Sequence, residues 1–191
     1  MPFVNKLRNL SPYVNLSQLT VCIPDPKMYR MISQHFYNYT SHQFPNGLLL
    51  EVRKESILTS DVEIITNAAN TLLSHGGGIA LAISNAAGPG LQQCCDERIR
   101  TRGQLRTSEF CLTPSFNLTQ FKSIAHVVGP IYDSRLRQKN IEELYTGIFD
   151  LLVYCDNFGY KSIAIPAVSS AIYGFPKKLC SETIIRAIKD F

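Results

Sequence analysis

Two asparagines and three consecutive glycines stand close together in the sequence. Asn67 and Asn70 follow a short apolar run, and the glycines at 76–78 precede a stretch of small residues that begins near Ile79. Glycines between a strand and a helix let backbone N–H groups approach a ligand with no side chain in the way, and the helix N-terminus adds a partial positive charge. This order of residue types predicts a binding site for a phosphate or diphosphate, with a mobile connecting loop as the alternative.

A second glycine-containing segment follows another apolar run far downstream. Residues 161–166 read as a buried strand, and the loop 169–174 comes after it. Strands alternate with helical patterns along the chain, which predicts a mostly parallel sheet with helices on both faces. Ligands bind such sheets at the carboxyl ends of the strands, so we expect this loop to lie beside the loop at 74–79.

The apolar periodicity predicts the elements that position these loops. The expected strands cover residues 48–52, 62–66, 109–113, 124–128 and 161–166. The expected helices cover residues 27–39, 79–87, 91–102 and 140–157, with a last helix that opens at Pro176 and runs towards Phe191.

Composition and charge restrict the class of protein. The chain has 191 residues, of which 45% are hydrophobic, and this predicts one domain with a sizeable core. The net charge of +4 is uneven, since residues 1–46 contribute +3, which argues against a nucleic-acid footprint over the whole domain. No apolar run is long enough to cross a bilayer. The N-terminus lacks a signal-peptide hydrophobic region, so we expect the cytosol or the nucleus and no membrane partner.

Six cysteines are scattered along the chain without a CxxC pair. We interpret them as reduced and mostly buried thiols. Because paired ligand spacing is missing, we expect no metal site, and we expect no resident cofactor.

Several motifs resemble those of the macrodomain family, the ADP-ribose-binding modules. They are Asn67-Ala68-Ala69-Asn70, His75-Gly76-Gly77-Gly78-Ile79-Ala80, His126-Val127-Val128-Gly129-Pro130 and Ser162-Ile163-Ala164-Ile165-Pro166-Ala167-Val168-Ser169-Ser170-Ala171-Ile172-Tyr173-Gly174-Phe175-Pro176. The resemblance covers roughly residues 48–191. The chain is most similar to the macrodomains of antiviral ADP-ribosyltransferase-like proteins and to viral macrodomains that read GGG-Val-Ala.

The resemblance implies a three-layer α/β/α fold with a mixed, mostly parallel central sheet. It assigns residues 47–191 to the macrodomain and leaves residues 1–46 as an N-terminal extension with a short helix. The family normally has one more strand after the helix that ends near Phe191, and the chain stops before it. Either the extension fills the missing edge of the sheet or the protein is trimmed.

The resemblance also implies the ligands, which are ADP-ribose and mono-ADP-ribosylated proteins. The residues implied to contact ADP-ribose are Ser56, Ile57, Asn67, Asn70, Gly76, Gly77, Gly78, Ile79, Val168, Ser169, Ser170, Ala171, Ile172 and Tyr173. In the family the Asn70 position binds the distal ribose, and the aromatic at the Tyr173 position packs against that sugar.

Two departures from the family pattern predict weaker binding. Ser56 occupies the position of an aspartate that accepts a hydrogen bond from the adenine amino group, and a serine brings no charge. Ala171 replaces a glycine of the second phosphate loop, where an alanine would be strained if the backbone needs a positive φ. The double change Ser56→Asp and Ala171→Gly is therefore expected to tighten binding.

Catalysis is the second function that the resemblance implies. The candidate catalytic residues are Asn70, His75 and Gly78, in an enzyme that removes mono-ADP-ribose from acidic side chains. One branch of family hydrolases carries an aspartate two residues after the glycine triplet, and Ala80 stands there in this chain, so acid–base help from that carboxylate is excluded. A third alternative is a degenerate macrodomain that serves as a protein- or RNA-interaction surface.

Overall fold

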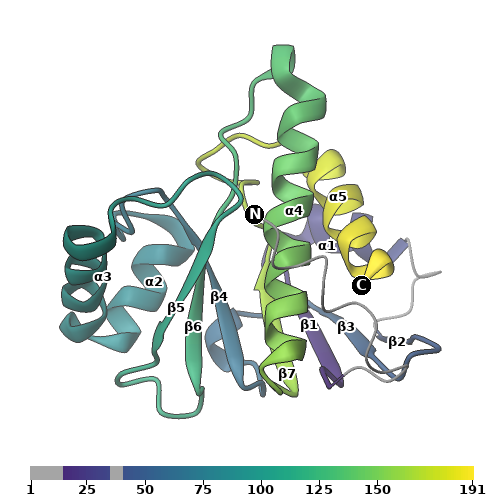
Figure 1. Cartoon of the computed structure of the whole chain (residues 1–191). Helices are drawn as coiled ribbons and strands as arrows, with labels where there is room; N and C mark the ends of the chain where they lie inside the picture. Colours follow the sequence, from purple (N-terminus) through teal and green to yellow (C-terminus); the bar gives the residue numbers. More distant parts are fainter. Residues whose placement is uncertain (1–14, 35–40) are drawn as a thin grey trace.

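The computed structural model describes residues 15–34 and 41–191 (Figure 1). Its strands are β1 (Gln18–Cys22), β2 (Ser41–Gln43), β3 (Leu49–Arg53), β4 (Ile64–Ala69), β5 (Phe110–Pro114), β6 (Ser123–Val128) and β7 (Ser162–Pro166). Its α-helices are α1 (Pro26–Gln34), α2 (Gly78–Ala87), α3 (Pro89–Arg102), α4 (Arg137–Asn157) and α5 (Lys177–Asp190). Two short 3₁₀ turns, η2 (Ile57–Thr59) and η3 (Ser134–Leu136), complete the described elements.

The strands form one mixed sheet in the order β2-β3-β1-β7-β4-β6-β5. The five inner strands run parallel to their inner neighbours, and only the edge strands β2 and β5 pair in the antiparallel sense. Helices α2 and α3 lie on one side of the sheet, and α1, α4 and α5 lie on the other (Figure 1). The three-layer α/β/α architecture with a mostly parallel sheet is therefore confirmed.

Strand β1 lies near the centre of this sheet, although it belongs to the stretch expected to be an extension. It pairs in parallel with β3 and with β7, so that Gln18 stands opposite both Leu49 and Ser162. Residues 18–22, from the stretch N-terminal to 47, therefore take part in the sheet, as the first of the two alternatives requires. The strand occupies an inner place in the sheet rather than an edge.

Helix α1 follows β1 and covers the sheet beside α5. It spans Pro26–Gln34, whereas the apolar spacing predicted a helix over 27–39, of which residues 35–40 lie outside the described part of the chain. Met28 and Ile32 are buried in the same cluster as the apolar face of α5. The predicted short helix is therefore present, and it packs into the domain instead of projecting from it.

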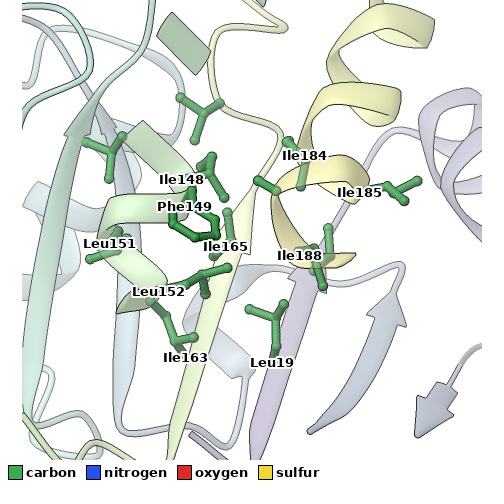
Figure 2. Packing of buried hydrophobic residues seen from close by; sticks show 14 of the residues in the cluster. Leu19, Ile148, Phe149, Leu151, Leu152, Ile163, Ile165, Ile184, Ile185 and Ile188 are labelled. Atoms are coloured by element: carbon green, nitrogen blue, oxygen red, sulfur yellow. The ribbon is translucent and has the colours of Figure 1, made fainter. Parts of the chain in front are cut away.

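Apolar side chains from the inner strands build two cores, one on each face of the sheet. In β7, Ile163 and Ile165 belong to the core under α4 and α5, together with Leu152 and Ile188 (Figure 2). Ala164 belongs to the core under α2 and α3. This alternation follows from the two-residue period of a strand. A strand buried on both faces reads as a continuous apolar run, and Ser162–Pro166 reads that way.

The parallel strands β3, β1, β7, β4 and β6 all end at one edge of the sheet. Five connections therefore leave this edge: those after Cys22, Arg53, Ala69, Val128 and Pro166. No helix in the described part of the chain is both long and apolar enough to cross a membrane.

Candidate functional site

A cavity of about 610 Å³ opens at the carboxyl edge of the sheet. Four of the connections at this edge contribute to its wall, those after β1, β4, β6 and β7. The lining residues are Cys22, Ile23, Pro24, Asp25, Met28, Ala68, Ala69, Asn70, Ser74, Gly76, Gly77, Gly78, Ile79, Ala80, Gly129, Pro166, Ala167, Val168, Ser169, Ser170, Ala171, Ile172, Tyr173 and Lys177. The two glycine-containing loops expected to meet therefore do line one cavity.

The first loop leaves β4 through a turn that the side chain of Asn70 closes. Its Oδ1 accepts hydrogen bonds from the N–H groups of Leu72 and Ser74, at 3.1 and 3.0 Å, and its Nδ2 donates to the Ser74 carbonyl at 2.9 Å. The glycines then lead into α2, whose first-turn N–H groups have no partner within the helix. Gly78 has φ +58°, a left-handed conformation that glycine adopts without strain.

The second loop folds tightly between β7 and α5. Ser169 has φ +66°, its carbonyl accepts from the Phe175 N–H at 3.0 Å, and the Ser170 hydroxyl donates to the Ala167 carbonyl at 2.7 Å. Ala171 is not among the described residues with positive φ, so the strain expected at that alanine is absent. The residue that adopts the left-handed conformation in this loop is Ser169 instead.

The two loops approach each other at the mouth of the cavity. A Cβ built on Gly77 would lie 3.4 Å from Cδ1 of Ile172, whose side chain is 77% exposed. Behind the second loop, Gly129 lies so close that a Cβ there would stand 2.1 Å from Oγ of Ser169. The position of the second loop therefore requires glycine at 129. Ile172, on the second loop, lies opposite the glycines of the first loop.

Most of the predicted ligand-contacting residues line the cavity. They are Asn70, Gly76, Gly77, Gly78, Ile79, Val168, Ser169, Ser170, Ala171, Ile172 and Tyr173. Ser56, Ile57, Asn67 and the catalytic candidate His75 do not line it.

Each of these four residues has a different structural role. Ser56 is exposed, and its hydroxyl accepts from the Leu58 N–H at 3.3 Å, which caps the turn η2. Ile57 is buried in the core under α2 and α3. Asn67 and His75 point into the protein interior, where both are buried. Ser56 and Ile57 were expected as contacts because they occupy the positions of family ligand-binding residues. In the structure neither of them lines this cavity.

Asn67 and His75 belong to a polar cluster behind the first loop. The Nδ2 of Asn67 donates to Nδ1 of His126 at 3.0 Å, and Nε2 of His126 then donates to Oγ1 of Thr113 at 3.0 Å. Nδ1 of His75 bonds Oε1 of Gln92 at 2.6 Å. Burial lowers the pKa of His126 from 6.5 to about 3, so its imidazole is neutral at physiological pH.

One ion pair supplies the charged side chains of the described cavity wall. Nζ of Lys177 lies 2.6 Å from Oδ2 of Asp25, and this hydrogen bond lowers the pKa of the aspartate. Burial raises the pKa of the Cys22 thiol to about 12 and also raises that of Tyr173. The wall therefore offers backbone N–H groups, hydroxyls and apolar surface, with its one acid and one base paired to each other.

Sequence reasoning missed the part of the wall that comes from the β1–α1 junction. Cys22, Ile23, Pro24, Asp25 and Met28 lie in the stretch that carries no resemblance to the family. The apolar run 19–23 was a signal for a strand. It could have indicated that a connection from this stretch also ends at the ligand-binding edge.

Comparison with known proteins gives the family. The family model described as "Macro domain" matches residues 66–184. The human protein mono-ADP-ribosyltransferase PARP14 is 35% identical over 144 residues, which is 75% of this chain but 8% of that protein. An O-acetyl-ADP-ribose deacetylase of Escherichia fergusonii is 35% identical over 143 residues, covering 74% of this chain and 79% of that protein. The chain thus spans less than a tenth of the human relative and most of the bacterial one.

Solved structures agree with this assignment. The Oceanobacillus iheyensis macrodomain with ADP matches with a TM-score of 0.75 and 30% identity, over 79% of this chain and 80% of that chain. The Trypanosoma brucei macrodomain in complex with ADP-ribose matches with a TM-score of 0.59 and 28% identity, over 71% and 53% of the two chains. The sequence motifs, the order of the strands and these matches together show that the chain belongs to the macro domain family.

Proposed function

We propose that this domain binds ADP-ribose, both free and attached to mono-ADP-ribosylated proteins. The observation that carries the proposal is the cavity of about 610 Å³ in which the loops after β4 and β7 face each other. Its size lies within the range of roughly 300–1,000 Å³ that is typical of small-molecule sites. Related macrodomains have been solved with ADP and with ADP-ribose, which supports the same ligand class here.

The diphosphate fits between the two loops. The first turn of α2 presents unpaired N–H groups at its N-terminus, where the helix dipole favours an anion. The only charged side chains on the described wall, Asp25 and Lys177, bind each other. The proposed recognition of the diphosphate therefore depends on backbone N–H groups and the helix dipole rather than on a free lysine or arginine.

The adenine fits the apolar side of the cavity. Ile23, Pro24 and Met28 from the β1–α1 junction line it together with Val168. Because Ser56 lies outside the wall, its missing carboxylate has no bearing on this arrangement. The distal ribose then falls towards Asn70 and Tyr173, where the remaining N–H of the Asn70 amide and the phenol can bond its hydroxyls.

Calorimetry with ADP-ribose tests the proposal. We expect binding by the wild-type protein and by Phe158→Ser, a control at a residue that is 67% exposed and outside the cavity wall. We expect Gly76→Val to fold normally, because a Cβ at Gly76 meets no atom within 4 Å. We expect the variant to lose binding, because Gly76 lines the cavity and a larger side chain there would take up ligand space. Absence of heat from folded wild-type protein at millimolar ADP-ribose would refute the proposal.

Hydrolysis of mono-ADP-ribose from acidic side chains is the second candidate. Two observations favour it: Asn70 lies in the cavity wall, and similar proteins carry the name O-acetyl-ADP-ribose deacetylase. Against it, the imidazole of His75 points away from the cavity, and the carboxylate of Asp25 is paired with Lys177. Release of label from an automodified transferase distinguishes hydrolysis from binding. If the wild-type protein and Asn70→Ala release label at equal rates, hydrolysis is excluded and only binding remains.

The remaining expectations stay predictions. The chain is expected in the cytosol or the nucleus, which fluorescence microscopy of the tagged protein would test. The interaction-surface alternative retains exposed Lys27 and Arg30 on α1 as basic groups that could touch RNA phosphates. Salt-dependent RNA binding that is lost when both residues are changed to serine would support that alternative.

A further inference from the structure

A cluster of three metal-ligating side chains lies behind the first loop and outside the ligand cavity. His75 precedes α2, Cys95 lies on α3, and His126 lies on β6, so three separate elements bring them together. One ligand atom from each lies within 4.8 Å of the others. All three residues are buried, with exposed fractions of 7%, 0% and 0%.

Two buried polar atoms at this cluster have no hydrogen-bond partner among the residues that the structure describes. They are Nε2 of His75 and Oδ1 of Asn67. Asn67 belongs to the cluster because its Nδ2 bonds Nδ1 of His126 at 3.0 Å. Leaving a buried polar atom unpaired is costly, and two such atoms in one cluster indicate that a partner is missing there.

The orientation of the imidazoles suits a metal ion. Gln92 accepts from Nδ1 of His75 at 2.6 Å, which leaves Nε2 of that ring with its lone pair free. Thr113 bonds Nε2 of His126 at 3.0 Å in the same way. Histidine ligands are commonly held by such a bond from the second ring nitrogen, which fixes both the tautomer and the ring position.

We propose that His75, Cys95 and His126 form a structural zinc site. Two imidazole nitrogens and one thiolate are ligands that select zinc among the common divalent ions. His126 would bind through Nδ1 once the Asn67 amide turns over. That half-turn exchanges the positions of Nδ2 and Oδ1. The side-chain oxygen of Asn67, which has no partner in the described part of the chain, would then face the metal as a fourth ligand. Binding replaces the Cys95 S–H bond by a Zn–S bond and releases that proton to solvent.

The site would hold the first loop from behind. His75 adjoins the glycines of the cavity wall in sequence, and Cys95 and His126 anchor the helix layer and the sheet. A metal bound to all three would link the loop, α3 and β6. The ion would make no contact with ADP-ribose, so this proposal stands or falls independently of the proposed function.

Metal titration of the protein tests the site. Protein freed of metal with a chelator and kept reduced is titrated with Zn²⁺ and, separately, with Co²⁺. We expect one Zn²⁺ per chain by elemental mass spectrometry, a rise in melting temperature, and a thiolate-to-cobalt charge-transfer band. In Cys95→Ser the band should vanish and Zn²⁺ should bind at least tenfold more weakly.

Cys155→Ser is the matched control, because Cys155 is equally buried but lies on α4 in the other core. It should keep the band and the stoichiometry. If Cys95→Ser fails to fold, the wild-type titration alone decides. Folded, reduced wild-type protein that binds no stoichiometric Zn²⁺ and shows no charge-transfer band would overturn the proposal, as would a band that Cys95→Ser retains.

Discussion

Gly129→Ala is the substitution that most directly tests the packing of the second loop. Gly129 follows β6, and a Cβ on it would lie 2.1 Å from Oγ of Ser169 and 2.7 Å from Cγ1 of Val168. Real Cβ atoms essentially never approach another heavy atom within 3.0 Å, so Oγ of Ser169 must move by about 0.9 Å and Cγ1 of Val168 must also shift. Both residues line the cavity, and the displacement therefore reaches the ligand site.

The loop has little freedom to yield. Ser169 already holds φ +66°, and its carbonyl is bound to the Phe175 N–H at 3.0 Å. Overpacking of this kind costs about 1–3 kcal/mol. If about 1.4 kcal/mol of that cost falls on the bound geometry of the loop, the affinity for ADP-ribose drops roughly tenfold.

Calorimetry with ADP-ribose and urea denaturation measure the two effects. Gly76→Ala is the control for stability, because its Cβ meets no atom within 4 Å. Adding Ser169→Gly to Gly129→Ala should recover part of both losses, since it removes the nearest contact and the non-glycine left-handed residue. A Gly129→Ala protein with wild-type stability and wild-type affinity would refute this account of the second loop.

Three further variants test other parts of the site. Gly78→Ala forces a non-glycine residue to φ +58°, which should destabilise the protein by roughly 1–2 kcal/mol in urea denaturation and weaken ADP-ribose binding by calorimetry. Lys177→Met removes the ion pair that lowers the pKa of Asp25. The wild-type ion pair stabilises the fold above the ordinary carboxyl pKa of 3.8, and this contribution is lost as pH falls through the lower pKa of the folded state. In a circular-dichroism titration below pH 3.8, the stability of the variant should therefore depend less on pH than that of the wild type. Ser56→Asp should leave the dissociation constant for ADP-ribose unchanged, because Ser56 lies outside the cavity wall; a clear tightening would restore the adenine contact inferred from the sequence motif.

The sequence predicted the position of the two loops well, because glycines and strand ends mark it. Glycines at 76–78 and the strand that ends at Pro166 mark where N–H groups can face a ligand, whatever the side chains around them. The parallel order of the strands then brings the loops together. Side-chain roles were harder to predict, because they depend on which face of the strand each residue occupies.

Asn67 and Asn70 illustrate that difficulty. Both look like ligand contacts in the sequence, yet Asn67 lies within β4 opposite His126, while Asn70 follows the end of the strand and reaches the cavity. His75 likewise bonds Gln92 and does not line the cavity. The place of β1 could not be read from adjacent residues, because its partners β3 and β7 are distant in sequence and only the folded sheet shows that it lies between them.

Mapping of backbone amides by NMR during a titration with ADP-ribose tests whether the cavity between the two loops binds this ligand. We expect the largest shift changes on residues 76–80 and 168–173, with smaller changes at the β1–α1 junction, because these segments line one cavity. The amides of α4 near Phe158 should remain still and serve as the internal reference. Saturating ADP-ribose that leaves both loops unperturbed, or that perturbs a surface away from them, would contradict the claim that this cavity is the binding site.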